Sequence, residues 1–147
     1  MELTPCVFCR IAQGELPAHY VYRSDEHLVF LDHRPLFPGH CLVVPREHTV
    51  TFLDIPTERL GPLFALVQRV CRAVELGMGA DGVLNAINTR VSQSVPHAHI
   101  HVIPRKKKDG LRGFFFPRYT YKGRDEMDRV RDAIAGAMKA HQYEKAT

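Results

Sequence analysis

The chain has 147 residues, of which 45% are hydrophobic and 24% are charged, as in a soluble globular protein. This length suits one domain with a hydrophobic core of its own. No apolar run approaches the ~20 residues that a membrane-spanning helix needs, and the first residues lack the basic and apolar regions of a secretory signal. The formal net charge of +4 is mildly basic, and the four cysteines fit a cytoplasmic protein whose thiols stay free or bind metal.

The first part of the chain predicts one short helix and three strands. Residues 6–13 favour a helix that stops near Gly14 and Pro17. A loop is expected over residues 32–39, which contain two prolines and a glycine. Apolar and β-branched residues bounded by turn residues predict strands over residues 20–22, 28–31 and 40–44.

The apolar period then changes to three and four residues between Leu60 and Val74, which predicts an amphipathic helix. Asp54 or Thr57 is a candidate cap for its start, and Gly77 or Gly79 is expected to end it. A fourth strand is predicted over residues 82–88, followed by a polar loop. Beyond Gly123 a C-terminal helix is predicted with four apolar residues on one face, namely Met127, Val130, Ile134 and Met138.

Together these elements predict an α+β domain with a five-stranded, mainly antiparallel sheet. Its main helix follows the third strand, and a second helix lies near the C-terminus. Because one helix would leave an apolar sheet face uncovered, we expect a homodimer.

Three histidines alternate with apolar residues in Pro96-His97-Ala98-His99-Ile100-His101-Val102. Successive side chains of a strand point to opposite faces, so the fifth strand should place the three imidazoles on one face. Imidazoles in this arrangement suit metal binding, including the site of an iron oxygenase, or catalysis. A purely structural role is a third possibility, although burying three such rings without partners is costly.

The flanking residues narrow these possibilities. Ser92-Gln93-Ser94-Val95 precedes the histidines, and Phe30-Leu31-Asp32, Pro38-Gly39-His40 and Val43-Val44-Pro45-Arg46-Glu47-His48 lie upstream. With these motifs the chain resembles the histidine triad nucleotide-binding family from Cys6 to Arg105. The resemblance implies a single domain of this fold over residues 1–147, with its core at about 5–105 and an extension at 106–147.

In that family the middle histidine, here His99, is the nucleophile that attacks the α-phosphorus of a nucleoside phosphate. The resemblance implies that His101 stabilises charge on the phosphate and that Gln93 and Ser94 contact the phosphate and help the leaving group depart. The implied nucleotide-binding residues are Val7, Phe8, Ile11, Phe30, Leu31, Asp32, His33 and Asn88, with Asn85 as the rival to Asn88. Asp32 would accept hydrogen bonds from the ribose hydroxyls, and the apolar residues would enclose the base.

Cys6 and Cys9 form a Cys-x-x-Cys motif at the start of the chain. A redox pair would normally lie within a βαβ unit, and a disulfide is poorly motivated in a cytoplasmic protein. Family members with this motif bind zinc through two further histidines, which correspond to His48 and His97. The resemblance therefore implies a structural zinc ion held by two thiolates and two imidazoles, with no open position for catalysis.

The substrate expected from the resemblance is a nucleoside 5′-phosphoramidate or a dinucleoside polyphosphate. We expect its base to be a purine that stacks in an apolar pocket. A nucleotidyltransferase and a non-catalytic nucleotide-binding module remain alternatives, and neither a membrane nor nucleic acid is an expected partner. Arg105-Lys106-Lys107-Lys108 is either a solvated loop or a cationic rim beside the histidines that attracts phosphates. Phe114-Phe115-Phe116 suits the core or a dimer interface.

Overall fold

The computed structural model describes residues 6–111 and 118–144. They fall into two compact units, residues 1–109 and 110–147, each of which is described by itself. The first unit contains the expected core at 5–105, whereas the prediction that the whole chain acts as one domain stays a prediction. The elements in chain order are α1 (Val7–Ala12), β1 (Tyr20–Arg23), β2 (His27–Leu31), β3 (Cys41–Pro45), the short 3₁₀ helix η1 (Phe52–Asp54), α2 (Thr57–Met78), β4 (Gly82–Ala86), β5 (Ile100–Arg105) and α3 (Arg124–Glu144).

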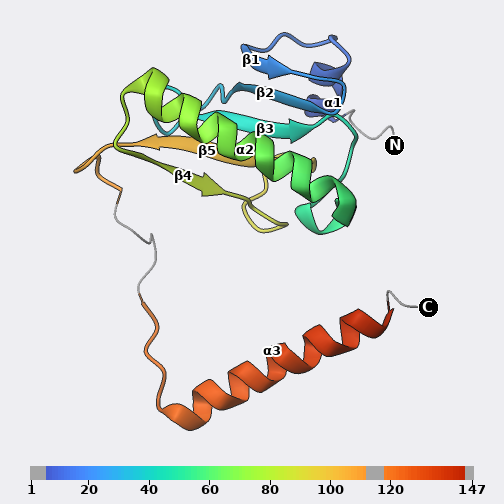
Figure 1. The fold of residues 1–147 in the computed structure, drawn as a ribbon, viewed down its shortest axis with the longest axis vertical. Helices are drawn as coiled ribbons and strands as arrows, with labels where there is room; N and C mark the ends of the chain where they lie inside the picture. The colour runs from blue at the N-terminus through green and yellow to red at the C-terminus, as the bar shows by residue number, and fades with distance from the viewer. Residues whose placement is uncertain (1–5, 112–117, 145–147) are drawn as a thin grey trace. The chain divides into compact units, whose positions relative to one another are not determined.

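The first unit is built on one five-stranded sheet in the order β1-β2-β3-β5-β4. Every neighbouring pair of strands is antiparallel. Helix α2 crosses one face of this sheet, and α1 lies beside β2 near the N-terminal edge (Figure 1). The predicted α+β class, with its five-stranded antiparallel sheet and main helix after the third strand, is confirmed.

The side chains of the central strands alternate between two hydrophobic clusters. Val29, Val43 and Val102 point towards α2 and pack against Leu63 and Val67. The intervening residues point to the other face, where a second cluster contains Phe8, Ile11, Leu28, Phe30, Leu42 and Val44. The period of two thus divides each strand between a face that packs on α2 and a face that packs on α1. His101 lies on the α1 face, because its neighbours Ile100 and Val102 belong to the α2 cluster.

The ends of α2 differ in part from the expected caps. Gly79 ends the helix in the left-handed conformation with φ +57°, as one of the two predicted stops. The start was predicted wrongly, because Pro56 occupies the N-cap and provides no side-chain cap. Asp54 instead caps η1, where its carboxylate accepts hydrogen bonds from the backbone N–H and the hydroxyl of Thr51.

The histidine strand also begins later than predicted. β5 starts at Ile100, so His97 and His99 precede it and only His101 lies within it. Pro96 has no N–H to donate, and the N–H of Ala98 donates to the carbonyl of Thr49 (2.7 Å) in the loop after β3. These contacts replace the ladder that would have extended the strand, and they turn the three imidazoles towards different partners.

The second unit contains α3, the predicted C-terminal helix. The four apolar residues predicted to share one face are all exposed within the described residues, from 38% for Val130 to 62% for Met138. Phe114–Phe116 lie outside the described residues, and homodimer formation stays a prediction. No described helix is both long and apolar enough to cross a membrane.

The packing of α2 on the sheet leads to a stability prediction. Leu63 is 1% exposed and fills the space between α2 and the sheet, so Leu63→Ala should lower the free energy of unfolding by about 2–5 kcal/mol. Leu76→Ala is the matched control, because Leu76 lies on the same helix and is 87% exposed. Urea unfolding measures both, and equal losses would contradict the assignment of the core.

Candidate active site and metal centre

The histidine segment holds His99 by a hydrogen bond to its own backbone. Nδ1 of His99 lies 2.7 Å from the carbonyl oxygen of His97, and the His99 side chain is buried. A carbonyl oxygen can only accept, so Nδ1 carries the proton and Nε2 of the neutral ring keeps its lone pair. The backbone thereby leaves His99 with an unprotonated nitrogen, as a nucleophile requires.

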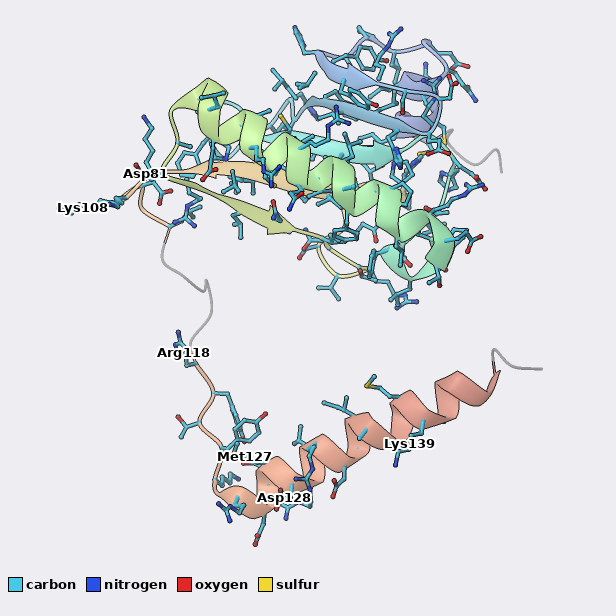
Figure 2. The ribbon with its side chains drawn as sticks, viewed as in Figure 1. Asp81, Lys108, Arg118, Met127, Asp128 and Lys139 are labelled. Carbon is cyan, nitrogen blue, oxygen red and sulfur yellow. The ribbon has the colours of Figure 1, made fainter. Side chains whose placement is uncertain are left out.

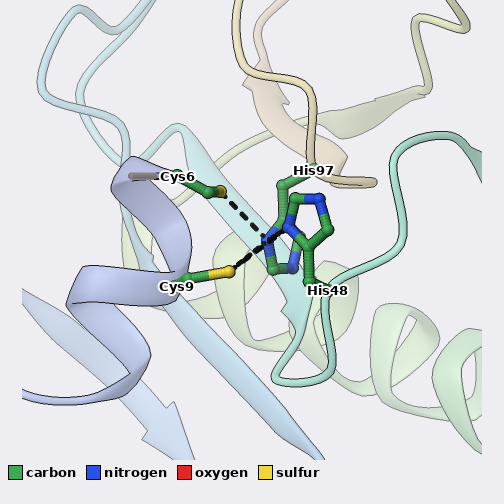
Figure 3. A group of neighbouring side chains, drawn as sticks. All are labelled: Cys6, Cys9, His48 and His97. Atoms are coloured by element: carbon green, nitrogen blue, oxygen red, sulfur yellow. Dashed lines mark hydrogen bonds between the residues drawn. The ribbon is translucent and has the colours of Figure 1, made fainter. Parts of the chain in front are cut away.

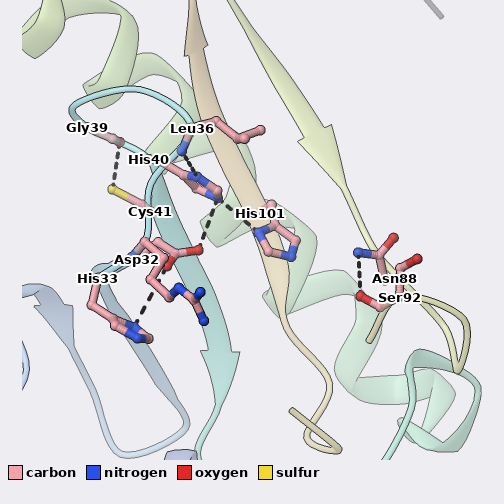
Figure 4. A network of polar contacts seen from close by, with 10 residues as sticks. Asp32, His33, Leu36, Gly39, His40, Cys41, Asn88, Ser92 and His101 are labelled. Atoms are coloured by element: carbon pink, nitrogen blue, oxygen red, sulfur yellow. Dashed lines mark hydrogen bonds and ion pairs between the residues drawn. The ribbon is translucent and has the colours of Figure 1, made fainter. Parts of the chain in front are cut away.

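A second chain of hydrogen bonds fixes the tautomers of His40 and His101 (Figure 4). The backbone N–H of Leu36 donates to Nδ1 of His40 at 3.1 Å, so a neutral His40 carries its proton on Nε2. Nε2 of His40 lies 2.9 Å from Nδ1 of His101 and donates to it. The proton of a neutral His101 therefore sits on Nε2, where it is available to an anion.

Burial and neighbouring imidazoles keep this network neutral. Burial, together with the nearby His99 and His40, lowers the pKa of His101 to about 4, although Asp32 opposes the shift. Burial also lowers the pKa of His40, again opposed by Asp32. At neutral pH both rings therefore act as hydrogen-bonding groups without charge.

His99 and His101 line a cavity of about 760 Å³, a size typical of small-molecule sites. The structure brings ten of the predicted site residues to this cavity, namely Val7, Phe8, Ile11, Phe30, Leu31, Asp32, His33, Ser94, His99 and His101. Most of the lining is apolar, and the polar groups are few. This composition suits a ligand with a planar apolar part and a polar end.

Asp32 provides the carboxylate of the cavity at the end of β2. Its Oδ1 accepts from the backbone N–H of Arg34 at 2.8 Å, and its Oδ2 lies 3.6 Å from Nε2 of His40. These contacts hold the carboxylate in place and leave acceptor capacity on both oxygens. Hydroxyl groups of a ligand are suitable donors to it.

Two predicted site residues, Gln93 and Asn88, do not line this cavity. The Gln93 side chain donates to the carbonyls of Val50 (2.6 Å) and Val95 (3.1 Å) and accepts from the N–H of Arg90. The amide of Asn88 donates to the carbonyl of Ser92 at 3.2 Å. Both side chains stabilise the loop that carries Ser94, and their direct contact with a ligand stays a prediction. Asn85, the rival to Asn88, accepts a hydrogen bond from the Cys71 thiol.

The four predicted metal ligands converge at one point (Figure 3). Sγ of Cys6 lies 3.4 Å from Nδ1 of His97, Sγ of Cys9 lies 3.2 Å from Nδ1 of His48, and the two Nδ1 atoms are 3.2 Å apart. A tetrahedral zinc ion at ordinary bond lengths places its ligand atoms about 3.3–3.8 Å apart. The observed separations of 3.2–3.4 Å are close to the lower end of this range, so the donor atoms are spaced nearly as such an ion requires.

The protonation of the cluster fits a metal as well. Nε2 of the fully buried His97 donates to the carbonyl of Pro45 at 2.7 Å, which leaves the lone pair of Nδ1 directed at the cluster. Burial and the neighbouring Cys6 raise the pKa of Cys9 to about 11, so this thiol keeps its proton at neutral pH when no metal is bound. A zinc ion would have to displace that proton, which makes its binding dependent on pH.

Asp32, His40 and His101 form another group with closely spaced potential ligand atoms. The hydrogen bonds decide against a metal there. Because the N–H of Leu36 occupies Nδ1 of His40, the proton of His40 sits on Nε2, the atom that faces the other two residues. A ligating nitrogen must be unprotonated, so this group serves as a hydrogen-bonding network.

The basic segment lies at the C-terminal end of β5, away from the histidines. Lys106–Lys108 follow the far end of β5 and line a different cavity, so they do not line the one that holds His99. Of the two alternatives for this segment, the cationic rim of the histidine site is therefore wrong, and the three lysines are exposed. The strand that separates the two positions explains the error, since Arg105 ends the strand whose opposite end follows His99.

Sequence reasoning missed several residues of the site. The most important is His40, which was noted only within a Pro-Gly-His motif and here orients His101. Its burial at the end of a polar loop was not apparent from the periodicity. The cavity is also lined by residues that were not predicted as site residues. Leu42 lies within a predicted strand, Val95 ends the Ser-Gln-Ser-Val motif, and Leu16, Pro17, Ala18 and His19 precede the first predicted strand.

Comparison with known proteins identifies the family. Residues 13–108 match the family model of the HIT domain. An uncharacterised HIT-like protein of Mycobacterium tuberculosis is 43% identical over 109 residues, which cover 73% of this chain and 76% of that protein. The chain therefore belongs to the HIT family of proteins, and the predicted resemblance is confirmed.

Two relatives with named activities and one solved structure are informative. An adenosine 5′-monophosphoramidase of Schizosaccharomyces pombe is 32% identical, with 91% of this chain and 98% of that protein covered. An adenylylsulfatase of Arabidopsis thaliana is 35% identical, with 72% and 55% covered. The crystal structure of a zinc-bound histidine triad family protein from Mycobacterium smegmatis is 37% identical, with 92% and 97% covered and a TM-score of 0.68.

The neutral state of His101 predicts a pH dependence of stability. Its pKa is lowered in the folded chain to about 4 from the ordinary 6.5, so the unfolded chain binds a proton first as the pH falls. The stability from this group is complete above pH 6.5 and is lost as the pH falls towards 4. Ring-proton NMR should give a midpoint near 4 for the signal that disappears in His101→Asn, and a midpoint near 6.5 would contradict the network.

Proposed function

We propose that this HIT-family protein is a nucleotide hydrolase that forms a nucleotidyl intermediate on His99. The observation that supports this most strongly is the hydrogen bond from Nδ1 of His99 to the carbonyl of His97, which leaves Nε2 unprotonated within the cavity wall. The named activities of the two relatives, a monophosphoramidase and an adenylylsulfatase, are consistent with transfer at an α-phosphorus.

In the proposed reaction, Nε2 of His99 attacks the α-phosphorus, and the bond from phosphorus to the leaving group breaks. Nε2–H of His101 donates to a phosphate oxygen and stabilises the charge that grows there in the transition state. The hydroxyl of Ser94 donates a hydrogen bond to the departing group, which takes up a proton from solvent as it leaves. Water then attacks the same phosphorus and gives up a proton to solvent, the bond to His99 breaks, and a nucleoside monophosphate leaves.

The proposed binding mode places the base among Phe8, Ile11 and Phe30 and the ribose hydroxyls at Asp32. Burial of a planar base in an apolar cavity is favourable for any purine, so we expect a purine nucleotide. The phosphate would then lie towards His99 and His101. Gln93 would act on the phosphate by holding the loop that carries Ser94.

We also propose that Cys6, Cys9, His48 and His97 hold a structural zinc ion. Four protein ligands would close the coordination sphere, so the ion would supply cross-linking and no catalytic water. It would join α1 to the loop after β3 and to the histidine segment. The zinc-bound structural relative supports this assignment.

The first test concerns the covalent intermediate. His99→Ala should abolish the radiolabelled nucleotidyl adduct that forms with adenosine 5′-phosphoramidate and should lower kcat/KM by at least about a thousandfold. His27→Ala is the control, because His27 lies at the start of β2 and does not line the cavity that contains His99. An undiminished adduct in His99→Ala would refute the assignment.

The same assay separates the competing functions. Rates on adenosine 5′-phosphoramidate, adenosine 5′-phosphosulfate and diadenosine tetraphosphate identify the leaving group. Inorganic phosphate is then added to the assay. If nucleoside diphosphate forms and the yield of nucleoside monophosphate falls, the protein is a nucleotidyltransferase. Tight nucleotide binding without turnover on any of the three would indicate a regulatory module.

The second test concerns the metal. Purified protein should contain about one zinc ion per chain by atomic emission, as four protein ligands would complete a structural site. Cys9→Ser should lose the zinc and at least about 2 kcal/mol of unfolding free energy. Cys71→Ser is the matched control, because the Cys71 thiol donates to Asn85 outside the cluster. Metal-free wild-type protein with unchanged stability would contradict the proposal.

A further inference from the structure

A separate cavity of about 500 Å³ opens at the other end of β5 from His99. It shares no lining residue with the cavity that contains His99 and His101. Its apolar wall combines residues from the loop before β3, the end of α2 and the end of β5, namely Phe37, Pro38, Met78, Ala80 and Pro104. The size and the apolar wall are those of a small-molecule site.

Three exposed lysines, Lys106, Lys107 and Lys108, complete the lining. No ion pair joins their side chains to a carboxylate of another residue in the described ranges. The nearest acidic side chain of the lining, Asp109, is already engaged by the guanidinium of Arg105. The cavity therefore combines an apolar wall with a rim on which the lysines outnumber the acidic side chains.

The backbone that carries the lysines is held in a defined turn. The N–H of Asp109 donates to the carbonyl of Lys106 (3.1 Å), and Lys108 lies between them in the left-handed region with φ +64°. The N–H of Lys107 donates to the carboxylate of Asp81 at 2.8 Å. Asp81 and Lys108 lie together at one end of the sheet, from which the Lys108 side chain projects (Figure 2). The turn thus fixes the backbone positions from which the three lysine side chains extend around the apolar wall.

We propose that this cavity binds a small anion that carries a planar or apolar group, as a phosphorylated or carboxylated aromatic metabolite does. The apolar group would cover the wall that includes Phe37 and Met78, and the anionic group would face the lysines. The C-terminal end of α2 contributes a partial negative charge nearby, but three full positive charges outweigh it. The apolar wall is complementary to the apolar group and the lysines are complementary to the anionic group. A ligand with only one of these groups would contact only part of the cavity. The binding site is independent of the function proposed for His99.

Phenyl phosphate is a suitable probe, because it joins one planar ring to one phosphate. In a ¹⁵N NMR titration of the full chain, it should shift the amides of Phe37, Ala80, Lys107 and Asp109 together. Inorganic phosphate lacks the ring, so its dissociation constant, measured from the shifts of the same amides, should be at least about tenfold higher. If phenyl phosphate and inorganic phosphate bind equally, the apolar wall has no role and the proposal fails. The proposal also fails if only the amides of Phe8, Asp32 and His101 shift, because these residues line the other cavity.

Two variants test the two halves of the cavity separately. Replacing Lys106, Lys107 and Lys108 by Gln should weaken binding about tenfold or more, and Ala80→Phe should abolish it by filling the cavity without a change of charge. The control replaces Lys122, Arg129 and Lys139 in the second unit by Gln, which removes the same charge and should leave binding unchanged. Equal weakening by the control would indicate a general charge effect and overturn the proposal.

A titration with hexaglutamate tests another occupant. If hexaglutamate binds more tightly than phenyl phosphate and shifts the same amides, the surface binds an acidic protein segment and the proposal is overturned.

Discussion

The arrangement of the site depends on His97. The imidazole of His97 donates to the carbonyl of Pro45 and directs a lone pair at the cluster of proposed metal ligands, while the backbone carbonyl of His97 accepts the proton of His99. One residue therefore orients the proposed metal site with its side chain and the proposed nucleophile with its main chain. A shift of His97 would disturb both, because the tautomer of each neighbouring ring is set by these contacts.

The loop between β2 and β3 provides the other half of the arrangement. Asp32 stands at its beginning and His40 at its end, and the N–H of Leu36 between them fixes the tautomer of His40. The same loop contributes Phe37 to the cavity at the far end of β5. A segment with two prolines and a glycine thus forms part of two separate sites. Gly39 shows why the loop needs its composition: it adopts φ +94°, and a Cβ there would lie 2.6 Å from Met78.

Much of this could be predicted from the sequence where one period governs a whole element. The continuous apolar runs of β2 and β3 predict strands that are buried on both faces, and the structure buries them. The three-to-four spacing of α2 predicts a buried face, of which Val67, Val70 and Val74 are buried while Phe64 is 41% exposed. Motif resemblance then identified residues from separate elements that line one cavity. Both successes rest on patterns that are local in the sequence or shared across a family.

The errors arose where a contact between distant residues determined the outcome. Thr49, from another loop, pairs with Ala98 and delays the start of β5, and Thr51 recruits Asp54 to η1 in place of α2. Lys106 is close to the histidines in sequence, yet an extended strand of about 3.3 Å per residue carries it to the other end of the sheet. His40 is 61 residues from His101, and neither periodicity nor composition predicts that their rings meet. In each case the partner is invisible until the chain is folded.

The hydrogen bonds of the imidazoles explain how a small domain tolerates so polar a site. A buried imidazole without partners would cost several kilocalories per mole, and a charged one more. Here each ring donates or accepts in a direction that the backbone imposes, from Leu36 through His40 to His101 and from His99 to His97. Burial favours the neutral forms of His40 and His101. The hydrogen bond adds to this, because protonating His101 on Nδ1 would turn the acceptor of the His40 proton into a second donor. The same hydrogen bonds that stabilise the site also direct the lone pair of a neutral His99 and the Nε2–H of His101 as the proposed phosphate chemistry requires.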